Sequence, residues 1–343
     1  MKGMVIIMSI VTIIGAGVMG SAMSFPLSDN GHTVRLVGTM LDREIINHVI
    51  DTLYHPNLKR SLPNGIECHQ LETLENAVTG ADLVICGVSS FGVEWFSENI
   101  IPRLPPSVPI LSVTKGMFNL PDGTLMSYPK FYAGKYPDRS FNAIGGPCTS
   151  YELADRDFTH ICFCGQNLTK LEEMKKILET PYYNISLTTD IEGLECAVAL
   201  KNAYALAVTL AVGLSKRSGD TIHYNSQAAL FGQSVKEMRK LLSLFGYADE
   251  NIIYGAGDLY VTVFGGRTRM IGTLLGLGHS FDEAMRELEG VTLESIVIST
   301  RVGEAVQTLI NAGKADSADF PLLLHVYDII TNGATVDIPW KAF

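Results

Sequence analysis

A lysine within an apolar helical segment is the residue most suggestive of chemistry. Lys201 lies in the run Glu-Cys-Ala-Val-Ala-Leu-Lys-Asn-Ala-Tyr-Ala-Leu-Ala-Val, with apolar residues three, four and seven positions away on the same helix face. A buried ammonium group is costly unless it has a carboxylate partner or gives up its proton. Two interpretations stand, a structural ion pair and a general base. The adjacent Asn202 can position a substrate or hold backbone groups.

A second lysine follows a predicted strand. Residues 109–113, Pro-Ile-Leu-Ser-Val, are followed by Thr-Lys-Gly, so Lys115 stands just beyond the end of the strand. In open α/β sheets, ligands bind beyond the carboxyl ends of the strands, and Lys115 is expected in such a crevice. The alternative is a solvated lysine at the end of a strand.

A segment rich in glycine and arginine forms a third candidate. Residues 255–269, Gly-Ala-Gly-Asp-Leu-Tyr-Val-Thr-Val-Phe-Gly-Gly-Arg-Thr-Arg, surround the single acid Asp258 with glycines. This composition predicts a loop that wraps a small anion and leads into a helix near Arg269. Arg267 could fork onto phosphate oxygens beside the amides of the helix N-terminus. A surface loop with solvated arginines is the alternative.

A glycine motif near the N-terminus predicts a dinucleotide site. Residues 15–20, Gly-Ala-Gly-Val-Met-Gly, follow a predicted strand and precede a helix, which is the context that gives GxGxxG its meaning. The acid expected about 20 residues later, which would bind a ribose 2′-hydroxyl, is missing. The second strand ends in Val37-Gly38-Thr39, and Asp42 comes only after the next turn. Arg43 could meet a 2′-phosphate, so both NAD and NADP remain open.

The elements that must position these residues fall into two halves. Up to residue 188, β-branched strands alternate with helices, which is typical of an α/β Rossmann domain with a doubly wound, mostly parallel sheet. The predicted strands are Val11–Ile14, Thr33–Val37, Asp82–Val88, Pro109–Val113, Phe141–Ile144, His160–Phe163 and Tyr183–Leu187. The predicted helices include Met19–Asn30, kinked at Pro26, Asp42–Tyr54, Phe91–Ile100 and Leu168–Glu179.

From residue 189 to 343 helical periodicity predicts an all-α C-terminal domain. Its predicted helices run from Asp190 to about Lys216, and over Tyr224–Phe245, Arg269–Leu277, Leu293–Asn311 and Pro321–Thr331. Residues 194–214 are apolar enough to cross a bilayer, but their first part contains Glu195, Lys201 and Asn202. We therefore predict a buried helix and no membrane span.

Composition excludes several function classes. The 343 residues carry 26 basic and 36 acidic side chains, a net charge of −10, which disfavours nucleic acid or an anionic membrane as a partner. The six cysteines show no metal-type spacing and the eight histidines no i, i+4 pair, so we expect reduced thiols and no metal site. The apolar N-terminus mimics a signal peptide but is better explained as a first strand, with translation starting at Met1 or Met8. These features predict a cytoplasmic protein.

Together the motifs resemble the NAD(P)-dependent glycerol-3-phosphate dehydrogenase family, within the two-domain superfamily that also contains 6-phosphogluconate dehydrogenase. The resemblance rests on the order and spacing of five motifs: GAGVMG, SVTKG, GPxxxxE at 146–152, ALKN, and GDLxxT followed by GGRxR. It implies an oxidoreductase that uses NAD or NADP to interconvert glycerol 3-phosphate and dihydroxyacetone phosphate. Such enzymes are commonly homodimers, and their partner is a small phosphorylated substrate.

The resemblance also implies roles for individual residues. Lys201 would be the catalytic base, assisted in catalysis by Lys115 and Asp258. The substrate site would contain Lys115, Lys201, Asn202, Asp258, Thr262, Arg267 and Thr268. The coenzyme site would contain Gly15, Gly17, Val18, Met19, Gly20, Thr39, Val88, Ser150, Arg267 and Glu294.

The chain departs from the family pattern at three places. Thr268 stands where the family usually has asparagine, Ser295 where it has glycine, and Val88-Ser89-Ser90 where it has Val-Pro-Ser/Thr. These positions lie toward the substrate and nicotinamide, so the reaction type is better supported than the substrate. Two other hypotheses remain: a dehydrogenase of another polyol phosphate or 2-hydroxy acid, and a dinucleotide sensor without catalysis.

Overall fold

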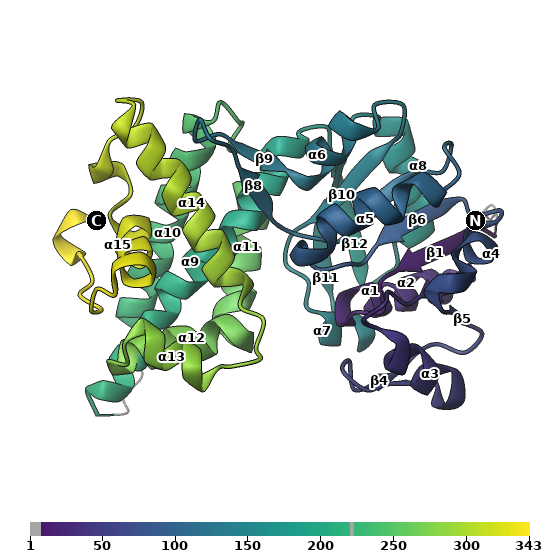
Figure 1. The fold of residues 1–343 in the computed structure, drawn as a ribbon, viewed down its shortest axis with the longest axis horizontal. Coiled ribbons are helices and arrows are strands. Elements are labelled where there is room, and N and C mark those ends of the chain that lie inside the picture. Colours follow the sequence, from purple (N-terminus) through teal and green to yellow (C-terminus); the bar gives the residue numbers. More distant parts are fainter. Residues whose placement is uncertain (1–7, 220–222) are drawn as a thin grey trace. The chain divides into compact units, whose positions relative to one another are not determined.

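The computed structural model describes residues 8–219 and 223–343, which form two compact units (Figure 1). The first unit comprises the chain up to residue 115 together with 128–191, and the second comprises 116–127 and 192–343. The boundary expected after residue 188 lies close to this division. The sequence did not predict that residues 116–127 belong to the second unit. Local periodicity cannot show that a hairpin packs with the other half of the chain.

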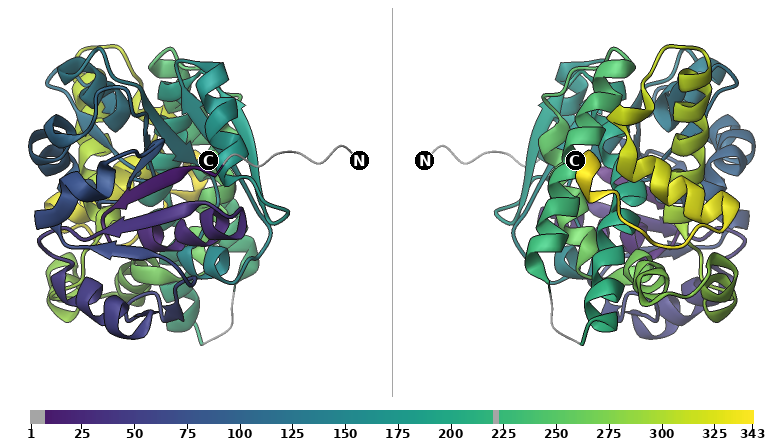
Figure 2. Two further views of the ribbon diagram at one scale, coloured as in Figure 1. Left: turned by 90° about the vertical axis from the view of Figure 1, so that its right-hand side faces the viewer. Right: turned by 90° about the vertical axis from the view of Figure 1, so that its left-hand side faces the viewer.

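An eight-stranded sheet forms the centre of the described part of the first unit (Figure 1; Figure 2, left). The strands are β1 (Ile10–Ile14), β2 (Thr33–Val37), β5 (Glu67–His69), β6 (Leu83–Cys86), β7 (Ile110–Ser112), β10 (Phe141–Gly145), β11 (Thr159–Gly165) and β12 (Tyr183–Thr188), in the order β12-β11-β10-β7-β6-β1-β2-β5. The first six of these run parallel, β11 is antiparallel to β10, and β12 is parallel to β11. All seven predicted strands are confirmed, and β5 is an addition too short to give a pattern.

The sheet contains a topological switch point. From β1 the chain proceeds to β2 and β5 on one side, then returns to β6 on the other side of β1. In doubly wound sheets, ligands bind at the carboxyl ends of the strands beside such a reversal. The loops that follow β1 and β6 therefore define the expected ligand crevice.

Helices flank the sheet. They are α1 (Val18–Ala22), α2 (Ser24–Asp29), α3 (Arg43–Thr52), α4 (Leu74–Val78), α5 (Val93–Asn99), α6 (Tyr128–Lys135), α7 (Ser150–Ala154) and α8 (Leu168–Leu178). Side chains of α1, α2, α3, α7 and α8 share one buried cluster with Val11 and Ile13 of β1. The single kinked helix predicted over 19–30 is instead two helices, broken at Met23. Pro26 has no N–H for the carbonyl of Ala22, and its ring crowds that carbonyl.

Over its described residues, the second unit is helical apart from one hairpin (Figure 2, right). Its helices are α9 (Ile191–Arg217), α10 (Tyr224–Leu244), α11 (Ile252–Val263), α12 (Gly266–Leu277), α13 (Phe281–Glu287), α14 (Glu294–Asn311) and α15 (Pro321–Asn332). The hairpin of β8 (Met117–Asn119) and β9 (Leu125–Ser127) packs on α14, where Arg301 donates to the carbonyl of Met117 at 2.8 Å. The five predicted helices are confirmed, whereas α11 and α13 are absent from the prediction.

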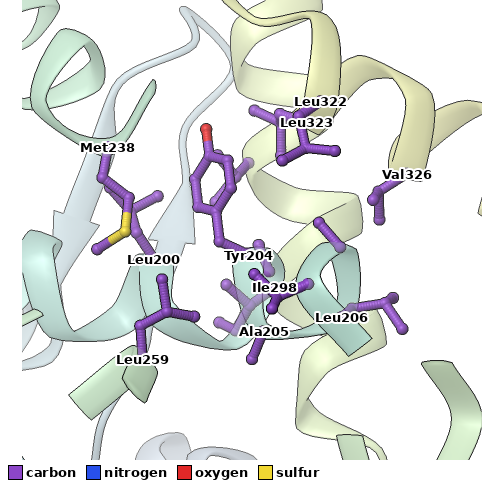
Figure 3. Close-up of a cluster of buried hydrophobic side chains, with 14 of the residues drawn as sticks. Leu200, Tyr204, Ala205, Leu206, Met238, Leu259, Ile298, Leu322, Leu323 and Val326 are labelled. Atoms are coloured by element: carbon purple, nitrogen blue, oxygen red, sulfur yellow. The ribbon is translucent and has the colours of Figure 1, made fainter. Parts of the chain in front are cut away.

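Helix α9 supplies the core of the second unit. Every residue from Gly193 to Gly213 is buried except Lys201. Side chains of α9 meet those of α10, α11, α14 and α15, as Figure 3 shows around Tyr204 and Leu206. Among the described helices of at least 18 residues, α9 alone has the hydropathy of a membrane span, with a mean hydropathy of 1.6, but 89% of that stretch is buried within the protein. The prediction of a buried helix is confirmed.

A buried carboxylate fixes the start of α15 against α10. Glu237 is fully buried and accepts hydrogen bonds from the amides of Leu322 and Leu323 at 2.9 and 3.0 Å. Gln233 and the hydroxyl of Tyr204 donate to the same carboxylate. The first amides of a helix have no partner within it, so this acid satisfies two of them and complements the helix dipole. Burial nevertheless raises the pKa of Glu237, outweighing the hydrogen bonds that lower it.

Replacing this acid should destabilise the second unit. In Glu237→Ala three or more buried donors lose their acceptor, at about 1–3 kcal/mol each, so we expect the free energy of unfolding to fall by at least about 3 kcal/mol. Urea denaturation measures this loss. The exposed Glu250→Ala is the control and should change stability by less than about 0.5 kcal/mol. Because the pKa of Glu237 is raised in the folded state, stability relative to Glu237→Gln should decline as pH rises above about 4.5.

Candidate coenzyme and active sites

The glycine motif forms a tight turn between β1 and α1. Gly15 has a φ of +108°, and a Cβ there would lie 2.8 Å from the backbone of Gly87, just after β6. A Cβ on Gly20 would lie 2.4 Å from the carbonyl oxygen of Gly15. At Gly17 the nearest atom would be 3.8 Å away, so its missing side chain serves no protein packing and leaves the loop open to a ligand. The loop therefore has the cradle that a pyrophosphate needs, next to the unpaired amides of a helix start.

A pocket of about 390 Å³ lies beside this loop. It is lined by Gly15, Gly17, Thr39, Met40, Leu41, Asp42, Gly87, Val88, Ser89, Phe91, Gly92 and Trp95. The side chains of Met40, Leu41 and Phe91 are exposed. Exposed apolar side chains beside a pocket are expected where they pack against a bound group such as an adenine base. The pocket lies at the switch point, so these residues fit the adenosine half of a dinucleotide.

The structure separates the predicted coenzyme residues into three groups. Gly15, Gly17, Thr39 and Val88 line the pocket, and Val18, Met19 and Gly20 continue from it along α1. Ser150 is the first residue of α7, which packs against α1. Arg267 and Glu294 belong to the second unit. Sequence reasoning missed Phe91 and Trp95 as pocket residues, although their i, i+4 spacing just after β6 was a usable signal.

Lys115 lies at the carboxyl edge of the sheet, as its strand predicted. It follows β7, and its Nζ donates to the carbonyl of Gly146, just beyond β10, at 2.9 Å. The GPxxxxE segment that begins at Gly146 leads into α7, whose N-cap Thr149 accepts the amide of Glu152. Lys115 is thus held against the same loop that presents Ser150.

Lys201 is the centre of the candidate active site in the second unit. Its Nζ donates to Asp258 Oδ1 at 3.0 Å and to Thr262 Oγ1 at 2.9 Å. The Asp258 side chain is 2% exposed and that of Lys201 14%, so the carboxylate is enclosed while the lysine side chain keeps a small accessible area. Asn202 is buried beside Lys201 on α9. An enclosed acid that holds a partly accessible lysine is an arrangement suited to proton transfer.

A glycine contact between α9 and α11 places this triad. A Cβ on Gly255 would lie 2.5 Å from the carbonyl oxygen of Ala197, so the two helix backbones touch there. Lys201 lies one turn after Ala197 on α9, and Asp258 lies one turn after Gly255 on α11. The loop predicted over 255–269 is therefore wrong. Leu259 and Val263 give α11 a buried apolar face, and Gly255 serves the helix crossing and no turn.

Arg267 and Thr268 are the second and third residues of α12. A pocket of about 530 Å³ lies there, lined by Lys216, Gly266, Arg267, Arg269, Met270, Thr273, Leu274, Glu287 and Leu288. Three cations beside the N-terminus of a 12-residue helix suit an anion. Lys201 does not line this pocket, and Thr268 is buried, with its carbonyl accepting from Thr209 Oγ1 at 3.4 Å. No group of three His, Cys, Asp or Glu side chains able to hold a metal lies within residues 8–219 and 223–343.

Comparison with known proteins decides the family. The family models described as NAD-dependent glycerol-3-phosphate dehydrogenase N-terminus and C-terminus match residues 10–170 and 190–340. An NADP(+)-dependent glycerol-3-phosphate dehydrogenase of Archaeoglobus fulgidus is 35% identical over 333 residues, 96% of this chain and 97% of the relative. This chain belongs to the NAD-dependent glycerol-3-phosphate dehydrogenase family. The protein is accordingly an NAD(P)-dependent oxidoreductase, and the resemblance inferred from five motifs is confirmed.

Other members of the glycerol-3-phosphate dehydrogenase family agree. A glycerol-3-phosphate dehydrogenase [NAD(P)+] of Desulfotalea psychrophila is 29% identical over 94% of this chain and 93% of its own length. The glycerol-3-phosphate dehydrogenase structures from Coxiella burnetii and yeast superpose with TM-scores of 0.80 and 0.78, at 22% and 20% identity, over 98% of this chain and 97% and 98% of theirs. At that identity the structures establish the shared fold.

The α9–α11 crossing can be tested with a single methyl group. Gly255→Ala forces the helices apart, so we expect the free energy of unfolding to fall by about 1–3 kcal/mol. Displacing Asp258 from Lys201 by about 1 Å should reduce turnover by about 100-fold. The control is Gly232→Ala on α10, where a Cβ meets nothing within 4 Å and stability should rise by up to about 1 kcal/mol. Equal turnover in Gly255→Ala and Gly232→Ala would refute the role of the crossing.

Proposed function

We propose that the protein interconverts glycerol 3-phosphate and dihydroxyacetone phosphate, with Lys201 as the general base. The observation that carries the proposal is the Lys201–Asp258–Thr262 cluster on α9 and α11. Family membership and the name of the A. fulgidus relative support this substrate. When bound, the nicotinamide exchanges a hydride with the carbon that bears the secondary alcohol.

The residues of the cluster divide the proton transfer between them. In the oxidation of glycerol 3-phosphate, neutral Lys201 takes the hydroxyl proton at Nζ, and in the reverse direction its ammonium returns that proton to the forming alkoxide. Asp258, held in one position by burial, stabilises the ammonium once it forms. Thr262 Oγ1 donates to the backbone carbonyl of Asp258 at 2.7 Å. This bond fixes the orientation of the Thr262 hydroxyl, and so the direction from which its oxygen accepts the hydrogen bond of Lys201 Nζ.

Other predicted residues complete the proposed sites. Arg267 and the amides at the start of α12 bind the substrate phosphate, beside Thr268. Lys115 and Asn202 fix the remaining substrate oxygens. The glycine loop binds the coenzyme pyrophosphate. Arg267 and Glu294 are further proposed coenzyme residues. We also propose a cytoplasmic homodimer, which would have a light-scattering mass of twice the 37.3 kDa chain.

We further propose that the enzyme accepts NADP. Residues 37–39, at and just after the end of β2, contain no acid, and Arg43 begins α3 close by. The nearby carboxylate of Asp42 accepts three hydrogen bonds at Oδ2, from Ala16 and Thr39, which offset its charge. Arg43 is half exposed and pairs with Glu72 at the surface, where a phosphate could compete for the guanidinium. The A. fulgidus relative, named as NADP(+)-dependent, supports the same coenzyme.

The base assignment is tested by two substitutions at one position. Lys201→Ala should lower kcat by at least about 100-fold while coenzyme fluorescence still reports binding. Lys201→Arg keeps a cation for Asp258 but cannot act as a base near neutral pH, so it should be equally inactive. The exposed Lys236→Ala serves as control and should leave kcat unchanged. Near-normal turnover of Lys201→Arg would favour the structural ion pair instead.

Substrate and coenzyme are tested together in an activity panel. We expect reduction of dihydroxyacetone phosphate but not of unphosphorylated dihydroxyacetone, because the cations at α12 recognise the phosphate. Arg43→Ala should raise the KM for NADPH by about tenfold and leave that for NADH unchanged, since only NADPH carries the 2′-phosphate. Lys176→Ala, an exposed lysine of α8, is the control for charge alone. Equal KM changes for both coenzymes would exclude Arg43 as the 2′-phosphate contact.

A further inference from the structure

The second residue of the glycine motif is held on both sides by the chain segment that follows β2. The amide of Ala16 donates to Asp42 Oδ2 at 3.1 Å. The carbonyl of Ala16 accepts from His55 Nε2 at 2.9 Å. Ala16 and His55 are both fully buried. One peptide unit on each side of Ala16 is thereby fixed by a side chain 26 or 39 residues away.

His55 is locked in one state by its second hydrogen bond. Its Nδ1 accepts the amide of Leu58 at 3.0 Å, so that nitrogen carries no hydrogen. The hydrogen of the neutral ring must then be on Nε2, where it donates to Ala16. The loop 55–58 thus orients the ring, and the ring orients the glycine motif.

Asp42 holds the other side through one oxygen. Besides the Ala16 amide, its Oδ2 accepts the amide of Thr39 at 2.9 Å and the hydroxyl of Thr39 at 2.7 Å. Three donors on one oxygen compensate for a negative charge placed beside a site for phosphates. They also join the adenosine side of the pocket, where Thr39 lies, to the pyrophosphate loop.

The adjacent parts of the motif are already fixed by backbone contacts. The amide of Gly15 donates to the carbonyl of Val37 in β2 at 2.9 Å, and Gly20 packs on the carbonyl of Gly15. The peptide groups of Ala16 lie between these anchors. Their orientation decides where the amides of Gly17, Val18 and Met19 point, and those amides are the ones available to a ligand.

We propose that His55 and Asp42 are positioning residues for the coenzyme, which align the glycine loop through Ala16. The proposal rests on the coenzyme use described above and adds two residues to it. In this role Asp42 acts on NAD and NADP alike, because the glycine loop binds the pyrophosphate that the two coenzymes share. This role differs from that of the acid in other dinucleotide sites, which contacts the ribose 2′-hydroxyl and discriminates between the two coenzymes.

The experiment is a fluorescence titration of the full chain with NADH and with NADPH. His55→Asn retains an acceptor near Nδ1 for Leu58 but loses the donor to Ala16, so the Kd of both coenzymes should rise by about tenfold. His55→Gln places an N–H near the position of Nε2 and should recover part of the affinity. Asp42→Asn should raise the Kd of NADH and NADPH by the same factor. Glu44→Gln, an exposed acid of α3, is the control and should bind as wild type.

Each outcome decides between the possible roles. A loss confined to NADH in Asp42→Asn would make Asp42 a ribose ligand and overturn its positioning role. Wild-type affinity in both His55→Asn and Asp42→Asn would overturn the proposal as a whole. If His55→Asn does not unfold cooperatively, the half-buried Asp42→Asn and Asp42→Ala carry the test. Failure of the wild-type chain to bind either coenzyme would instead refute the coenzyme use on which the proposal rests.

Discussion

Direct contact between backbones, made possible by glycine, is the constraint on which both units depend. In the first unit Gly15 touches the chain after β6, and Gly20 touches Gly15, which brings a helix start over the end of the sheet. In the second unit Gly255 meets Ala197, and Gly276 meets the backbone of Leu210. A methyl group at any of these places would separate elements that carry the candidate chemistry. The sites are therefore defined by how closely helices and loops can approach.

Close packing of the helices also determines where the positive charges of the candidate sites lie. The chain has a net charge of −10, yet the candidate sites collect lysine and arginine. Lys201 is the single interruption in a buried stretch of 21 residues, and it is tolerated because α11 brings Asp258 within 3.0 Å. At the start of α12, two arginines and the helix dipole act together. Attraction for an anionic substrate is thus concentrated at a few points of an acidic protein.

Sequence patterns predicted most of the first unit because its strands are short, β-branched and separated by clear turns. They failed where one residue type serves two purposes. Glycines in 255–269 predicted a loop, but in α11 they permit a helix crossing, and only the apolar pair Leu259 and Val263 indicated a helix. Asp42 looked misplaced for a ribose acid, and its bond to Ala16 depends on a turn geometry that periodicity does not encode. His55 gave no signal, since its partner lies 39 residues away.

The burial of α9 has a consequence for synthesis of the protein on the ribosome. Its apolar surface is covered by helices that follow it, and 115 residues separate Arg217 from the end of α15 at Asn332. At about 5–20 residues per second, translation of that stretch takes about 6–23 s. During this interval a helix with the hydropathy of a membrane span gains its cover only in steps, as α10, α11, α14 and α15 are made one after another. Of the described segments that share the buried cluster with α9, only the hairpin 117–127 is made before it and can cover part of its apolar surface from the start.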